Sequence, residues 1–171
     1  NWGVYDLDYL LGVTDWSLTP ETALAQTWPI AEHLNHHVAP GSDAETHVSA
    51  LIRCADGATI AMSRGEYLAT AGQNGWQIIG DRGAIRQPVG TAEAYRVLID
   101  VADPETGTRT ETLWEGAADW EAPHAGPVRD FADALLDGRP PATPLARARV
   151  VQQICDAIYA SAERGTCAAM P

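Results

Sequence analysis

Polar side chains recur at helical spacing at the very start of the chain. Asn1, Tyr5 and Asp8 stand at positions i, i+4 and i+7, which places them on one face of a predicted helix. Apolar residues follow the same period on another face: Val4, Leu7 and Leu11. Asn cannot titrate, and Tyr has a reference pKa of about 10.

A second group of residues, with side chains that can bind metals, lies at and around the histidines. The set that could ligate a metal is His33, His36, His37, Asp43 and His47. Among the histidines, only His33 and His37 have the i, i+4 spacing that puts two ligands on one helix face, and the nearby Pro29, Pro40 and Gly41 argue against a helix. We therefore predict loop histidines and no metal site. Where this loop reaches a cleft, His36 and His37 are predicted to contact substrate hydroxyls.

Glycine spacing excludes the common dinucleotide motif. A Rossmann fingerprint needs GxGxxG between a strand and a helix, so that backbone amides and the helix N-terminus meet the pyrophosphate. Gly72-Gln73-Asn74-Gly75 and Gly80-Asp81-Arg82-Gly83 do not fit this pattern, and both lie between predicted strands. We expect no cofactor to be bound by this chain alone. The sequence also has no GxSxG, which disfavours a hydrolase.

Composition narrows the class of protein and of partner. A chain of 171 residues with 46% hydrophobic content suits one globular domain over residues 1–171. No apolar run approaches the ~20 residues of a membrane span. The net charge of -12 disfavours nucleic acid and anionic membranes as partners. All eleven basic residues are Arg, so any Lys that assists a proton transfer must come from elsewhere.

Cysteine usage indicates the redox compartment. Cys54, Cys155 and Cys167 are odd in number, widely spaced and form no CxxC pair. This pattern predicts buried free thiols in a reducing, cytoplasmic environment.

Periodicity predicts an α+β fold. After the first helix, which Gly12 and Thr14-Asp15 should end, the period changes to two. Strands are predicted at 23–33, 47–54, 58–68, 76–79, around 85, at 95–101 and at 108–114. Short turns join them, which favours an open, mostly antiparallel β-sheet. Two helices, from Pro127 to Gly138 and from a Thr143 cap to Gly165, are predicted to pack with the first on one face of that sheet.

Three stretches resemble the C-terminal domain of Gfo/Idh/MocA oxidoreductases. Residues 1–11 (NWGVYDLDYLL) look like the helix that opens this domain and typically carries Asp-x-Gly-x-His-x-x-Asp. Residues 75–85 (GWQIIGDRGAI) resemble the family's G-x-x-G hairpin, and 131–165 are similar to its last two helices. The resemblance implies a fold like the C-terminal domain of glyceraldehyde-3-phosphate dehydrogenase. It also implies that the N-terminal Rossmann domain, with its NAD or NADP, is absent from this chain.

The resemblance implies roles for the first helix. In the family, a hydroxyl is oxidised by hydride transfer to the nicotinamide while a side chain takes the proton. Asn1 stands where the first Asp stands, Gly3 matches the Gly, Tyr5 replaces the His and Asp8 matches the second Asp. Tyr5 and Asn1 are thus the candidate catalytic residues, and Asp8 is a candidate substrate ligand. A nearby cation would be needed to lower the Tyr5 pKa into a useful range.

Two functions from different classes follow. The first is the substrate-binding and oligomerisation domain of an NAD(P)-dependent oxidoreductase acting on a sugar, polyol or similar hydroxylated substrate, inactive when isolated. The second is a non-catalytic binding or self-association module that kept the sheet and lost the chemistry. Family members commonly form homo-oligomers through the open sheet face, and residues predicted off the inward face fit that use: Leu51, Ile79, Leu98 and Leu113.

Overall fold

The structure, a computed structural model, describes residues 3–66, 74–89, 95–117 and 122–171. The chain divides into two compact units. Unit 1 comprises Asn1–Ala69 and Pro140–Pro171, and unit 2 comprises Thr70–Arg139. The predicted α+β class with antiparallel pairing is confirmed. Within the described residues, however, the strands form two four-stranded sheets where a single sheet was predicted.

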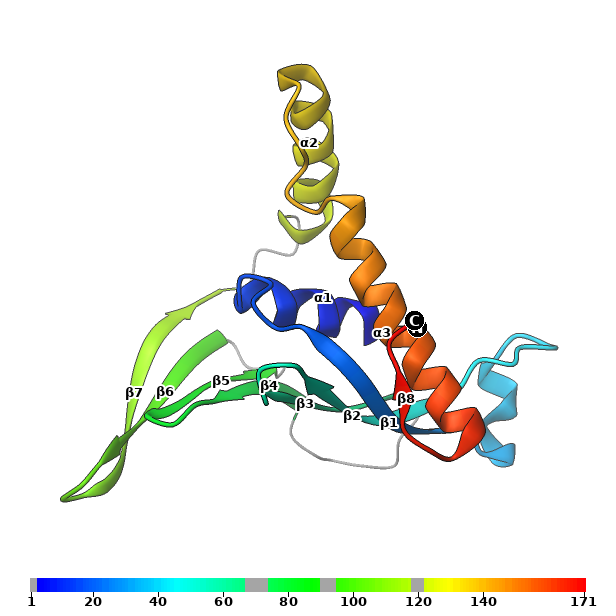
Figure 1. Cartoon of the computed structure of the whole chain (residues 1–171), viewed down its shortest axis with the longest axis horizontal. Coiled ribbons are helices and arrows are strands. Elements are labelled where there is room, and N and C mark those ends of the chain that lie inside the picture. The colour runs from blue at the N-terminus through cyan, green and yellow to red at the C-terminus, as the bar shows by residue number, and fades with distance from the viewer. Residues whose placement is uncertain (1–2, 67–73, 90–94, 118–121) are drawn as a thin grey trace. The chain divides into compact units, whose positions relative to one another are not determined.

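Unit 1 is a sheet covered by two helices on one face (Figure 1). Its strands lie in the order β3-β2-β1-β8, with antiparallel neighbours throughout. The strand bounds are β1 Pro20–Trp28, β2 His47–Cys54, β3 Thr59–Gly65 and β8 Ala168–Ala169. The helices are α1, Gly3–Val13, and α3, Leu145–Arg164.

Alternation along the strands builds the core of unit 1. Every second residue of β2 is buried, as period-two patterning predicts: Val48, Ala50, Ile52 and Cys54. Ala23 and Ala25 of β1 are also buried, and their small side chains suit the close packing of α3 on this strand. Leu7 and Leu11 of α1 complete the same cluster, together with Ile154 of α3. Both helices therefore bury their apolar stripes against one face of the sheet.

Turn and cap residues set the ends of these elements. α3 ends at Gly165, whose φ of +66° suits glycine and whose N–H donates to the Ser161 carbonyl at 2.8 Å. The predicted Thr143 cap is wrong, because Pro144 occupies the N-cap position and no side chain caps the helix. The first strand was predicted to run to residue 33, but β1 ends at Trp28. The next residue is Pro29, which has no N–H to donate to a neighbouring strand.

Unit 2 is an antiparallel meander with one helix. Its strands, in the order β4-β5-β6-β7, are Asn74–Ile79, Gly83–Val89, Tyr95–Asp103 and Gly107–Gly116. Helix α2 spans Ala122–Asp137 and contains Pro127 within it, whereas the sequence suggested that proline near the helix start. The predicted apolar stripe of α2 is exposed in the described chain: Val128 (71%), Phe131 (57%) and Leu135 (69%).

A polar row crosses three strands of unit 2. Arg86 of β5 donates through Nε to Asp100 Oδ2 of β6 at 2.6 Å, and Thr110 of β7 donates to Asp100 Oδ1 at 2.6 Å. Both hydrogen bonds lower the pKa of the Asp100 carboxyl from 3.8, and the one from Arg86 has the larger effect. The row ties β5, β6 and β7 together through one carboxylate.

Candidate functional site

Helix α1 presents a polar face opposite its buried stripe. Leu7 and Leu11 are almost fully buried, whereas Tyr5 is 67% exposed. Asp8 follows Tyr5 by three residues and is half-buried, so the two lie on neighbouring turns of one helix face. Asn1 lies outside the described residues. The predicted pair of Tyr5 and Asp8 is therefore available at one surface, where phenol and carboxylate can engage hydroxyl groups.

An ion pair that the sequence did not reveal fixes this helix to the sheet. Asp6 Oδ2 lies 3.6 Å from Arg64 Nε on β3. Partial burial raises the Asp6 pKa from 3.8, and the positive charge of Arg64 opposes that shift without overcoming it. Asp6 is adjacent to Tyr5 in the chain, so this contact joins α1 to β3 beside the position of Tyr5.

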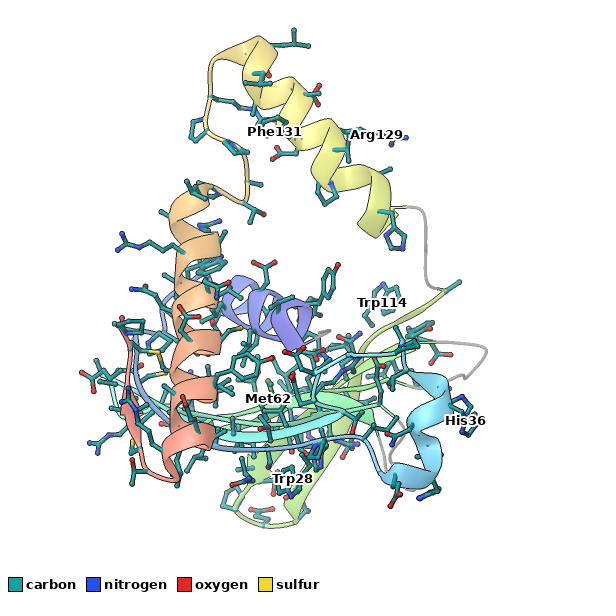
Figure 2. The ribbon with its side chains drawn as sticks, turned by 90° about the vertical axis from the view of Figure 1, so that its right-hand side faces the viewer. Trp28, His36, Met62, Trp114, Arg129 and Phe131 are labelled. Atoms are coloured by element: carbon teal, nitrogen blue, oxygen red, sulfur yellow. The ribbon has the colours of Figure 1, made fainter. Side chains whose placement is uncertain are left out.

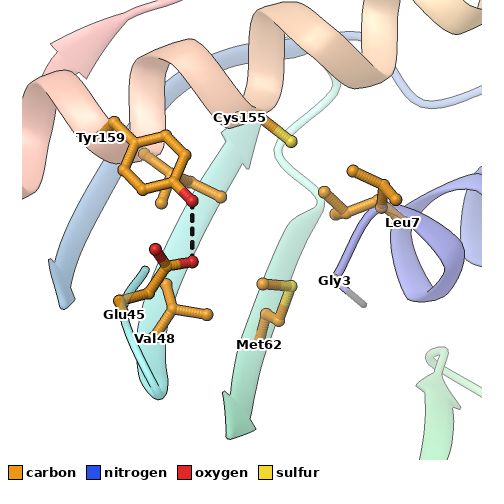
Figure 3. A pocket seen from close by; sticks show the side chains of 9 residues that line it. Gly3, Leu7, Glu45, Val48, Met62, Cys155 and Tyr159 are labelled. Atoms are coloured by element: carbon orange, nitrogen blue, oxygen red, sulfur yellow. Dashed lines mark hydrogen bonds between the residues drawn. The ribbon is translucent and has the colours of Figure 1, made fainter. Parts of the chain in front are cut away.

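A small cavity lies at the N-terminal end of α1 (Figure 3). It is lined by residues from α1, the segment before β2, two strands and α3: Gly3, Val4, Leu7, Glu45, Val48, Met62, Cys155, Ile158 and Tyr159. Its volume of about 10 Å³ is the space of one water-sized group. On one side the Tyr159 hydroxyl donates to Glu45 Oε1 at 2.7 Å.

The Cys155 thiol lines this cavity, and its pKa depends on the burial and the charges there. Burial is the largest cause that raises its pKa from 9.0, and the negative charges of Asp156 and Glu45 raise it further. Glu45 and Tyr159 are 114 residues apart, and no local pattern marks either one. Only the fold brings this pair together, which is why sequence reasoning missed it.

His36 and His37 lie in a separate element. They end the 3₁₀ helix η1, Glu32–His37, where their rings are 3.9 Å apart between centroids and tilted by 41°. Figures 1 and 2 show η1 at the edge of unit 1, apart from α1, with His36 pointing outward. The structure does not gather them with Tyr5 and Asp8. Across the described ranges no three His, Cys, Asp or Glu side chains are grouped as a metal site.

The face of the unit 1 sheet opposite α1 and α3 carries several exposed apolar side chains among the described residues. Leu24, Trp28 and Leu51 are each about half exposed there, and Figure 2 shows Trp28 on the opposite side of the sheet from Met62. Trp28 stacks on His47 with ring centroids 4.7 Å apart, and His47 Nε2 lies 3.1 Å from Ser63 Oγ. A shallow hollow of about 630 Å³ runs along this face. Two other residues predicted for an open face, Ile79 and Leu113, are exposed in unit 2, and Leu98 is half-buried.

The cysteines depart in part from the prediction of buried thiols. All three are free, with Cys54 buried, Cys155 half-buried and Cys167 exposed. Cys167 follows the end of α3, which explains its exposure. No helix in the described part of the chain is long and apolar enough to cross a bilayer.

Comparisons with known proteins rest on structure alone. No family model and no curated protein sequence matches the chain. An oxidoreductase domain protein from Kribbella flavida superposes with a TM-score of 0.75 at 15% identity, over 100% of this chain and 50% of its own. The aldose-aldose oxidoreductase from Caulobacter crescentus, in complex with glycerol, gives a TM-score of 0.68 at 16% identity, over 98% and 45%.

A levoglucosan dehydrogenase in complex with NADH gives a TM-score of 0.67 at 19% identity, over 90% of this chain and 45% of its own. The chain spans about half the length of each structure that it matches. At such identities the likeness establishes the fold. The chain therefore has the fold of about half of each of these oxidoreductases, and the fold that the sequence resemblance implied is confirmed at that level.

Proposed function

We propose that the chain is the C-terminal, substrate-binding domain of an NAD(P)-dependent oxidoreductase that acts on a sugar, polyol or similar hydroxylated molecule. One observation carries the proposal. Between 90% and 98% of the chain superposes on about half of two oxidoreductases, one in complex with NADH and one in complex with glycerol, while its own sequence lacks GxGxxG. NAD or NADP would then bind to a separate dinucleotide-binding part of the protein. The three free thiols favour a cytoplasmic location.

The exposed face of α1 would form the substrate wall. A nicotinamide held by the dinucleotide-binding part would supply a hydride acceptor for the carbon that carries the hydroxyl. As a phenolate beside a cation from the dinucleotide-binding part, Tyr5 would accept the hydroxyl proton; as a phenol it would hold the hydroxyl in a hydrogen bond. Asp8, one turn further, would accept a hydrogen bond from a second hydroxyl. Asn1 would donate or accept as an amide, and His36 and His37 would serve only where η1 meets a long substrate.

The experiment uses the full-length protein encoded with this chain. Within the ~130 residues before Asn1, that protein should have a predicted strand followed by GxGxxG. We expect the protein to reduce NAD or NADP with an aldose or polyol. Tyr5→Phe should lower kcat by about 10²-fold, the usual scale for a lost acid–base group. Tyr9→Phe, one turn along α1 and also exposed, is the matched control.

The outcomes separate the two functions. Turnover by the wild type with loss in Tyr5→Phe alone supports the oxidoreductase. Equal activity of Tyr5→Phe and Tyr9→Phe removes Tyr5 from the mechanism. A start codon directly before Asn1, with no turnover of any aldose or polyol, would favour the self-association module.

The apolar sheet face favours self-association in either case. We propose that a second copy covers the hollow around Leu24, Trp28 and Leu51, because large contiguous apolar patches on a protein surface usually mark an interaction site. Leu51→Asp should convert the oligomer into monomers in sedimentation velocity. Ala148→Asp, on the exposed side of α3, should leave the oligomer intact. A monomeric wild type would contradict this interface.

A further inference from the structure

We infer that self-association through the open face of unit 1, the sheet face opposite α1 and α3, is controlled by the protonation of His47. A neutral His47 permits a second copy to dock there, and a protonated His47 opposes it. The inference rests on the contact between two copies proposed above. Its own evidence is the arrangement around His47 and the kinds of side chain that share the open face.

His47 begins β2 and stands between two uncharged neighbours in the ladder. It pairs with Trp28 on β1 and with Gly65 on β3. Its ring stacks on Trp28, with centroids 4.7 Å apart and planes 22° apart, and its Nε2 lies 3.1 Å from Ser63 Oγ. Trp28 and Ser63 both line the hollow of the open face. A copy that covers this hollow would therefore also shield the imidazole from water.

The open face carries no carboxylate at the positions that the structure describes. Alternate residues of β1 from Thr22, of β2 from His47 and of β3 from Thr59 point to this face. None of them is Asp or Glu, although the chain has 23 acidic residues. Arg53 shares the face but stands six residues along β2, about 20 Å from His47. Residues 67–73, which lie outside the described ranges, include no Asp, Glu, Lys, Arg or His.

A second copy has no counter-charge to offer. In a two-fold contact both copies contribute the same surface patch, so a face without carboxylates meets another face without them. A protonated His47 would then be buried with no opposite charge beside it, which disfavours both the charged form and the contact that buries it. A neutral imidazole avoids this cost, and it can donate to or accept from the Ser63 hydroxyl.

The charged groups near His47 on neighbouring elements lie elsewhere or can be tested. Glu45 accepts a hydrogen bond from Tyr159 of α3 at 2.7 Å, on the helix-covered side of the sheet. Arg64 of β3 also points to that side, where its Nε lies 3.6 Å from an Asp6 carboxylate oxygen of α1. Glu66 is exposed one residue beyond β3, so its charge is removed in a control.

The sign of the pH effect separates this inference from general electrostatics. The chain has a net charge of -12 at pH 7 with its histidines neutral. Acid makes this charge less negative, so overall repulsion between copies falls and association should tighten. Burial of His47 predicts the opposite, because histidine ordinarily gains its charge between about pH 8 and pH 5. Weaker association in acid is therefore the specific signature.

The experiment is sedimentation velocity of this chain at about pH 8 and about pH 5.5, over a range of concentrations. The dissociation constant of the wild type should rise about tenfold or more in acid. His47→Gln keeps a neutral polar side chain and should associate equally at both pH values. His47→Lys is charged at both and should associate weakly even at pH 8. His33→Gln, exposed on η1, and Glu66→Gln should respond to pH as the wild type does.

Circular dichroism at both pH values shows that each variant is folded, and His47→Lys tests the charge without acid. A wild type that stays associated at pH 5.5, an unchanged pH response in His47→Gln, or full association of His47→Lys would overturn the role of His47 and leave the contact standing. A wild type that is monomeric at both pH values would overturn the contact together with its regulation. Loss of the response in Glu66→Gln would assign the effect to Glu66.

Discussion

The Ser161 hydroxyl of α3 accepts a hydrogen bond from the backbone N–H of Ala25 on β1 at 2.9 Å. It also donates to the Thr166 carbonyl at 2.7 Å. Ser161 is fully buried, and strand β8 pairs with β1 only at Thr22 and Ala23. Pairing between β8 and β1 therefore stops before Ala25, and the Ser161 side chain of α3 accepts the hydrogen bond from the Ala25 N–H instead.

Ser161→Ala should destabilise unit 1 by about 1–3 kcal/mol, because it leaves the buried Ala25 N–H and Thr166 carbonyl without this partner. Urea denaturation measures the change. Ser17→Ala removes an exposed hydrogen bond to Thr14 and should cost less than ~0.5 kcal/mol. Equal effects of the two substitutions would show that the Ser161 contacts do not matter.

Leu11→Ala should cost about 2–5 kcal/mol, because Leu11 is fully buried where α1 meets the core and the change leaves a cavity. Leu145 is 85% exposed at the start of α3, so Leu145→Ala should change stability by less than ~0.5 kcal/mol. Thermal unfolding of both variants tests the packing of α1, on which the position of Tyr5 depends. A small loss for Leu11→Ala would mean that α1 is not docked as described.

The Asp100 row predicts acid sensitivity in unit 2. The folded pKa of Asp100 lies below its ordinary 3.8, so its stabilisation is present above pH 3.8 and is lost as pH falls through the lowered value. Asp100→Asn should therefore be less stable than the wild type at neutral pH, and the gap should close below pH 3.8. Urea midpoints across that range measure it. Asp81→Asn, in an exposed turn, should show no such convergence.

Thiol labelling should distinguish the three cysteines. Burial raises the pKa of Cys54 and of Cys155 above 9.0, which lowers their thiolate populations, whereas Cys167 is exposed. One equivalent of maleimide should react quickly at neutral pH, and Cys167→Ser should abolish that phase. A fast phase that survives in Cys167→Ser would mean that the α3–sheet packing opens readily.

Local patterns predicted those parts of the fold that depend on local physics. The alternation in β2 gave its inward side chains, and Gly165 gave the end of α3, because burial on one face and positive φ both leave a mark in sequence. The division into two sheets leaves no such mark in the sequence. Strand pairing depends on partners far along the chain, and each strand alone reads the same in one sheet or two.

The site shows the same division. Tyr5 and Asp8 could be placed together because one helix carries both. The Asp6–Arg64 and Glu45–Tyr159 contacts join distant segments, so no spacing rule reveals them. His36 and His37 were grouped with the substrate site from their chemistry alone, and η1 keeps them apart from α1.

The most direct test of the central claim is a titration of this chain alone with NADH and with NADPH, followed by nicotinamide fluorescence. A substrate domain whose nucleotide is held by another part of the protein should show no saturable binding of either one. Tight, saturable binding of NADH or NADPH to these 171 residues would contradict the account.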